Sequence, residues 1–168
     1  MVNLETLYII ANIQLMKAEF INPFLSSLIN VLSTMSNIPL TPQRPILKKH
    51  NMAKGDVSGL IGMTAPNLKG SLSITFEKKL ALITMKKMVG EAHDKIDSDV
   101  MDMVGEITNM VAGGAKRILS EQGFEFNMAT PIVVSGEGHT ISHQSKDKIV
   151  LIPLKSDYGL VFIEISFE

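Results

Sequence analysis

A glutamate and an asparagine, Glu106 and Asn109, stand three residues apart in an otherwise apolar stretch. On a helix this spacing makes the two side chains neighbours on one face. A carboxamide both donates and accepts hydrogen bonds, so it can hold a water molecule in line for attack on an electrophile. A carboxylate beside it can pair with a lysine of another protein. Such pairs are also common on solvated helix faces, so their spacing alone leaves both interpretations open.

The stretch from residue 98 to residue 122 predicts the helix that would carry this pair. Ser98 is a suitable N-cap, Asp99 lies in the expected first turn, and Gly123 follows the end. At about 100° per residue, an apolar, inward stripe is formed by Val100, Val104, Ile107, Val111 and Ile118. The opposite, outward stripe is formed by Asp102, Glu106, Asn109, Gly113, Lys116 and Ser120.

Two consecutive glycines, Gly113 and Gly114, follow the pair within the same predicted helix. Each glycine in a helix interior costs about 1 kcal/mol relative to alanine. Something should compensate for this cost, and the close approach of another surface is one candidate.

A wider set of motifs surrounds the pair. It consists of three polar residues, two glycines, a proline and two flanking segments: Asp102, Glu106, Asn109, Gly113, Gly114, Pro131, EFINPF at 19–24 and TPIVVSG at 130–136. Together these motifs resemble the CheC/CheX/FliY phosphatases of bacterial chemotaxis, and the CheX branch in particular, over most of the chain. The resemblance implies an α/β (α+β) fold of the CheC-like, pseudo-twofold kind, with a central, mostly antiparallel sheet and long helices packed on one side.

The resemblance also implies an activity, the hydrolysis of the aspartyl phosphate of a CheY-like response regulator. Asn109 would orient the attacking water, and Glu106 would pair with the regulator's active-site lysine. Asp102 matches the leading position of the motif, with a capping or partner-contact role, and Gly113 and Gly114 would let the partner's backbone come close. Mg²⁺ is expected on the regulator, so we expect no cofactor and no metal site on this chain.

A non-catalytic adaptor is the alternative function. The same helix face could dock a response regulator or a flagellar-motor component without hydrolysing anything. The complete set of Asp102, Glu106 and Asn109 favours the phosphatase, because an adaptor does not need an amide at Asn109. The resemblance further implies a homodimer that pairs through its sheets.

Length and composition narrow the functional classes. The 168 residues are 45% hydrophobic and 20% charged, as in a single folded domain. Sixteen basic and seventeen acidic residues nearly cancel, and only 5% are aromatic, which argues against a nucleic-acid-binding surface. The absence of cysteine excludes disulfides, thiol catalysis and cysteine-ligated metals, and it agrees with a cytoplasmic location.

The first fifteen residues, 1–15, are either an N-terminal extension or a real first turn of helix, and a single domain is expected at 16–168. The apolar stretch 4–16 is too short to cross a membrane. It also lacks the basic start and the small-residue cleavage site of a signal peptide. We therefore expect no membrane association.

The remaining elements follow from periodicity and from turn residues. We expect helices at 22–36 and 77–91, a proline-rich loop at 37–45, a hairpin of strands 56–65 and 70–76, and strands at 124–134, 148–155 and 159–167. In the strand 70–76, apolar residues alternate with Ser71, Ser73 and Thr75, which predicts one solvent-exposed face.

A second Glu/Asn pair, Glu19 and Asn22, repeats the spacing of the first. Here Leu15 occupies the leading position of the motif, and Pro23 follows the asparagine directly. Asparagine before proline is typical of a helix start. We therefore interpret Asn22 as a helix cap and not as part of a second active site.

Two histidines, His139 and His143, have the i, i+4 spacing of a helical metal pair. They stand in a polar, glycine-containing stretch, 135–147, and no third ligand is near in sequence. The pattern therefore predicts a surface loop and not a zinc site.

Overall fold

The computed structural model describes Leu4 and residues 18–66, 68–143 and 149–167. The predicted extension 1–15, apart from Leu4, and the domain boundary at residue 16 lie outside these residues. In chain order the elements are α2 (Ala18–Ser36), β1 (Thr41–Pro42), β2 (Ile46–Lys48), β3 (Val57–Ala65), β4 (Leu68–Phe76), α3 (Lys78–Val89), α4 (Ser98–Glu121), β5 (Asn127–Met128), β6 (Ile132–Ser135), β7 (Ile149–Ser156) and β8 (Gly159–Phe167).

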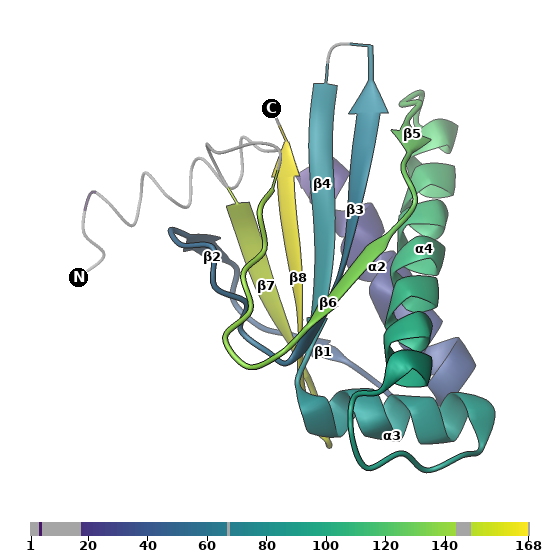
Figure 1. The fold of residues 1–168 in the computed structure, drawn as a ribbon. Helices are drawn as coiled ribbons and strands as arrows, with labels where there is room; N and C mark the ends of the chain where they lie inside the picture. Colours follow the sequence, from purple (N-terminus) through teal and green to yellow (C-terminus); the bar gives the residue numbers. More distant parts are fainter. Residues whose placement is uncertain (1–3, 5–17, 67, 144–148, 168) are drawn as a thin grey trace.

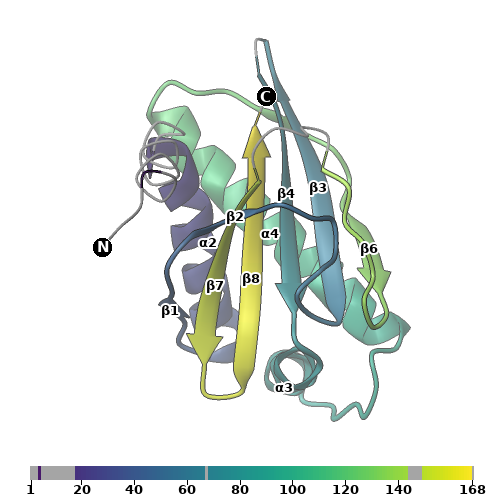
Figure 2. The same ribbon diagram turned by 90° about the vertical axis from the view of Figure 1, so that its left-hand side faces the viewer.

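The strands form one sheet in the order β1-β7-β8-β4-β3-β5, with β2 also paired to β7 and β6 also paired to β3. Every pairing among the described strands is antiparallel. The long helices α2 and α4 pack on one face of this sheet, and α3 lies across one end of it (Figures 1 and 2). This arrangement confirms the predicted α/β fold with long helices on one side.

The main core lies between the sheet and the two long helices. Alternate residues of the central strands point into it, among them Leu72, Ile74, Ile163 and Ile165, all fully buried. The predicted hairpin is confirmed as β3 and β4, and the predicted final pair of strands as β7 and β8.

The apolar stripe of α4 is confirmed over its first four turns, where Val100, Val104, Ile107 and Val111 are fully buried. Towards its end the helix buries Ala115 and Leu119, and Ile118 is only half-buried. The buried side thus rotates along the helix, since the strands of a twisted sheet meet a straight helix at a changing angle.

Helix α2 begins earlier than predicted, because Asn22 and Pro23 lie inside it and not at its start. The prediction of Asn22 as a cap is therefore wrong. Pro23 removes one backbone hydrogen bond from the second turn. The residues before it compensate by packing: Ile21 is 5% exposed, and the ring of Phe20 lies 4.7 Å from the ring of Phe124.

The prediction of a solvent-exposed face on β4 is also wrong. Ser71, Ser73 and Thr75 are at most 2% exposed. Two segments cover this back face of the sheet, one that follows β2 and one that includes residues 139–143. They bond to each other: Ala53 N donates to His139 O over 2.9 Å, and Ile141 N donates to Asn51 O over 2.7 Å. Alternation predicted the strand, but it carries no information about a distant segment that covers the polar face.

The predicted strand 124–134 is divided into β5 and β6. Between their pairs with β3, the partner strand advances three residues, from Met63 to Leu60, while this strand advances four, from Met128 to Ile132. The extra residue makes a bulge, and Pro131 there has no N–H group for a ladder bond. This bulge stands beside α4.

Candidate functional site

Helix α4 is capped one residue earlier than predicted, by Asp97 in place of Ser98. Asp97 Oδ1 accepts a hydrogen bond from Val100 N over 3.0 Å, and its Oδ2 lies 2.6 Å from His93 Nδ1. The bond between the two side chains lowers the pKa of Asp97 and raises the pKa of His93. The predicted end of the helix is confirmed, since Gly123 follows the C-cap with a positive φ of 90°.

One group of side chains in the described part of the chain has a metal-ligating composition. It consists of His93, Asp97 and Asp99, whose ligand atoms lie within 4.8 Å of one another. Asp97 already serves as the helix cap and bonds to His93. These contacts account for the group without an ion.

The outward face of α4 places Asp102, Glu106 and Asn109 side by side and exposed, as helical spacing predicts. They line a shallow pocket of about 440 Å³. The wall opposite the helix is the β5–β6 bulge, and it comprises Met128, Ala129, Thr130, Pro131 and Val133. The fold thus brings Pro131 beside the three polar residues, although the sequence separates them by more than twenty positions.

The polar side chains of this pocket are available to a partner. Asp102, Glu106 and Asn109 make no hydrogen bond or ion pair with any residue that the structure describes. An exposed amide and an exposed carboxylate, one turn apart and without internal partners, can accept and donate hydrogen bonds to an incoming surface.

Gly105 is a residue of the pocket that sequence reasoning missed. A Cβ atom at this position would lie 3.1 Å from Val133 Cγ2, so β6 lies close against the helix there. The signal was a third mid-helix glycine, directly before Glu106. Because Gly105 has no side chain, the pocket wall can stand next to the outward face of α4.

The two glycines that follow the motif have different roles. A Cβ atom at Gly114 would overlap Ser27 of α2, whose Oγ donates to Val111 O over 2.9 Å. The close approach at Gly114 is therefore between two helices of this chain. The expectation that another protein approaches closely at Gly114 is wrong. A Cβ atom at Gly113 would meet nothing within 4 Å, so the outward face is open there.

The second Glu/Asn pair does not join this pocket. Asn22 is exposed on α2 and lines a separate hollow with Leu25 and Ile29. Glu19 does not line that hollow and lies in the first turn of the helix.

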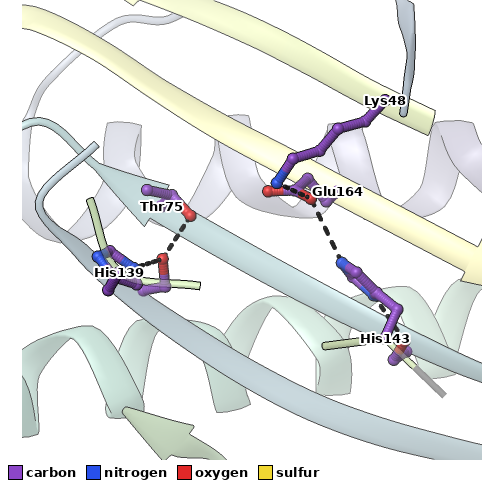
Figure 3. A network of polar contacts seen from close by, with 7 residues as sticks. Lys48, Thr75, His139, His143 and Glu164 are labelled. Carbon is purple, nitrogen blue, oxygen red and sulfur yellow. Dashed lines mark hydrogen bonds and ion pairs between the residues drawn. The ribbon is translucent and has the colours of Figure 1, made fainter. Parts of the chain in front are cut away.

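The two histidines lie on the covered back face of the sheet, where Figure 3 shows their rings pointing at polar side chains of the strands. His143 Nδ1 lies 2.6 Å from Ser71 Oγ, and His139 Nε2 lies 2.7 Å from Ser58 Oγ. Since His143 is only 8% exposed, the predicted surface loop is wrong for this residue. Residues 144–147 of that predicted loop lie outside the described residues.

A buried ion pair completes this polar layer (Figure 3). Lys48 Nζ donates to Glu164 Oε1 over 2.8 Å, and His143 Nε2 lies 3.4 Å from the same oxygen. Burial raises the pKa of Glu164, but the combined interactions with His143 and Lys48 outweigh burial and hold the pKa below its ordinary value. We define Lys48, His143 and Glu164 as the back-face cluster; it lies outside the pocket on α4.

Comparison with known proteins identifies the family to which this fold belongs. Residues 57–155 match the family model described as chemotaxis phosphatase CheX. The chain belongs to the CheX family. A CheC-like superfamily protein from Shewanella sp. PV-4 is 60% identical over 90% of this chain and 99% of its own, with a TM-score of 0.86. The chemotaxis protein CheX from Vibrio vulnificus is 58% identical over 90% of this chain and 100% of its own, with a TM-score of 0.84.

A more distant CheX has been solved with its partner. The CheX of Borrelia burgdorferi, crystallised in a complex with CheY, BeF₃ and Mg²⁺, is 27% identical over 89% of this chain and 97% of its own, with a TM-score of 0.74. No protein of curated function matches this CheX-family chain significantly. Within its described residues, no helix is long and apolar enough to cross a membrane.

Proposed function

We propose that this CheX-family protein hydrolyses the aspartyl phosphate of a CheY-like response regulator and so ends a chemotaxis or related two-component signal. The observation that carries the proposal is the exposed Glu106/Asn109 pair beside an open pocket on α4. The Borrelia burgdorferi complex supports a CheY-like partner. Such a phosphatase would act in the cytoplasm, where its substrate is made.

The reaction needs little covalent chemistry from the phosphatase. An aspartyl phosphate is an activated acyl phosphate, so the main requirement is a water held in line with the scissile P–O bond. The water oxygen forms the new bond to phosphorus, the bond to the aspartyl oxygen breaks, and the aspartate leaves as a carboxylate. Both hydrogens of the water leave with the inorganic phosphate, which then equilibrates its protons with the solvent. Mg²⁺ is expected on the regulator, and we assign no residue of this chain to hold it.

In this proposal Asn109 orients the water, because its amide is exposed and has no partner among the described residues. Glu106 lies one turn away and pairs with the regulator's lysine. Asp102 adds a contact one turn further on. On the other side of Asn109, Gly113 has no side chain, so the helix surface there is open to a partner. A Cβ atom at this position would meet no other atom within 4 Å.

The experiment that tests the proposal measures phosphate release from CheY-like receivers phosphorylated by acetyl phosphate with Mg²⁺, in the presence and absence of this protein. A phosphatase increases the rate of release catalytically. The adaptor alternative is supported instead if the protein binds a beryllofluoride-activated receiver but leaves its rate of phosphate loss unchanged.

Replacement of Glu106 is expected to weaken both receiver binding and hydrolysis. In Glu106→Ala the proposed pair with the receiver's lysine is lost, and we expect about a tenfold lower affinity together with slower release. Titration of the variant with beryllofluoride-activated receiver measures the first effect. Glu121→Ala removes an exposed carboxylate at the other end of the same helix and serves as the control. Unchanged affinity in Glu106→Ala would contradict the assigned role.

We also propose the homodimer that the family resemblance implies. Strand β6 lies at an edge of the sheet, and among the described strands it pairs only with β3. Two apolar residues of this strand are exposed, Ile132 by 63% and Val134 by 38%. An exposed apolar edge strand supports pairing with a second copy.

A further inference from the structure

The outward face of α4 carries opposite charges towards its two ends. Asp102 and Glu106 lie in the first half, Lys116 lies in the second half, and Asn109 and Gly113 lie between them. At about 100° per residue, all five lie within about 40° of one line along the helix. At a rise of about 1.5 Å per residue, Lys116 stands about 10 Å beyond Asn109 and about 15 Å beyond Glu106.

Lys116 lies on this line without a polar partner among the described residues. It is half-buried, and it makes no hydrogen bond or ion pair with any residue in the described ranges. It also does not offset the helix dipole, because the last turn of α4 contains no basic residue. At that end of the helix Ser120 Oγ donates to Glu125 Oε1, and this hydrogen bond does not involve the lysine.

Cations are rare on the two long helices that form this side of the molecule. Helix α2 contains no lysine or arginine, and Lys116 and Arg117 are the two basic residues of α4. Lys116 is the one that lies on the line of Asn109 and Glu106. A surface that docks along this line would meet acidic groups at one end and a single ammonium at the other.

We propose that Lys116 is a recognition residue for the response regulator, contacting an acidic side chain about 10 Å from its phosphorylated aspartate. This inference rests on the proposed function, because it assumes that the regulator docks on α4. With Glu106 on a cation near the phosphate and Lys116 on an acid further away, only one orientation along the helix pairs opposite charges. The reversed orientation would oppose like charges, so Lys116 sets the direction of docking.

A contact of this kind acts on the encounter and not on the bond-breaking step. Charge pairs at the rim of an interface change association and its salt dependence. Lys116 is therefore a positioning residue, and its loss raises KM while leaving kcat unchanged. A purely structural lysine would lower both the stability and the kcat of the variant.

The test measures phosphate release against the concentration of phosphorylated CheY-like receiver, including CheY of Borrelia burgdorferi, for four proteins. KM is expected to rise about tenfold in Lys116→Glu and about threefold in Lys116→Gln, with kcat within about twofold of wild type. Lys116→Gln retains much of the aliphatic stem that is half-buried. Lys86→Glu makes the same charge change at an exposed position on α3 and is expected to behave as wild type.

A charge-swap experiment strengthens the assignment. Each exposed acidic residue that lies about 10 Å from the receiver's phosphorylated aspartate is changed to lysine, one at a time. One of these receivers is expected to restore a low KM to Lys116→Glu. Lys116→Arg retains the charge and is expected to retain the wild-type KM.

The outcomes separate the inference from the function on which it rests. If wild type accelerates release and both Lys116→Glu and Lys116→Gln have its KM, the recognition role is overturned and the phosphatase stands. If wild type neither binds nor dephosphorylates any receiver, the proposed function fails, and the recognition role fails with it. If Lys116→Glu alone loses its helical circular dichroism, the KM values of Lys116→Gln and Lys116→Arg decide the question.

Discussion

Asn109→Ala is expected to abolish the accelerated release of phosphate from CheY-like receivers while leaving receiver binding nearly unchanged. The amide is exposed in the pocket between α4 and the β5–β6 bulge, and no described residue shares its hydrogen bonds. Its removal takes away the group that we propose holds the water in line. Misplacement of a reacting group by about 1 Å costs about a hundredfold in rate, so we expect a loss of at least about that size.

Two measurements on the same samples check this expectation. Phosphate release under single-turnover conditions reports the chemical step, and titration with beryllofluoride-activated receiver reports binding. Asn30→Ala removes an exposed amide from α2 and is the matched control. Asn109→Gln retains an amide one methylene further out and is expected to be slow as well. Full activity in Asn109→Ala would show that another group positions the water.

Lys48→Met is expected to destabilise the fold by about 3–5 kcal/mol, because it leaves the carboxylate of Glu164 buried without its main partner. Both side chains of the ion pair are nearly inaccessible, at 2% and 0% exposure. The pair also fastens β2 to β8, across the back face of the sheet. Denaturation by urea, followed by circular dichroism, measures the loss.

A double replacement distinguishes the stability that the ion pair contributes from the cost of leaving one charge buried without a partner. Lys48→Met with Glu164→Leu removes both charges and is expected to recover most of the lost stability, since apolar groups of similar size often replace buried ion pairs without loss. Lys54→Met changes an exposed lysine near the same segment and is the control. If Lys48→Met alone were as stable as wild type, the ion pair would not contribute to the stability of the back face of the sheet.

The same cluster predicts a dependence on pH. The pKa of Glu164 is held below its ordinary value, so the stability that this carboxylate contributes is present above the unfolded-state pKa of glutamate, about 4.3. That contribution is lost as the pH falls through the lower folded-state pKa. Wild type is therefore expected to lose stability more steeply in acid than the double variant does.

The face of α4 that carries Asp102, Glu106 and Asn109 could be derived from spacing, because helical periodicity is a local property. The same holds for the β3–β4 hairpin and for the turn between β7 and β8. The family resemblance added the proposed role of each residue. The prediction of helix ends was less accurate. The choice between Asp97 and Ser98 as the cap depends on which side chain adopts the rotamer that accepts a hydrogen bond from Val100 N.

Other features depended on contacts between segments that are far apart in the chain. Periodicity could not show that Ser27 fills the space at Gly114, or that β6 stands against Gly105. It assigned Ser71, Ser73 and Thr75 to solvent because it could not represent the segment carrying His139 and His143. It also placed the start of α2 too late, because the burial of Ile21 outweighs the local signal of Pro23.

The pocket wall shows the same division. Helical spacing put Glu106 and Asn109 on one face, but the bulge that brings Pro131 opposite them follows from the register of β5 and β6 on β3. Periodicity depends on neighbours within one or two turns, whereas register and the covering of a sheet depend on which distant segments reach it. The polar side chains of the candidate site are therefore determined by the local sequence of α4. The shape of the pocket comes from the packing of the sheet against that helix.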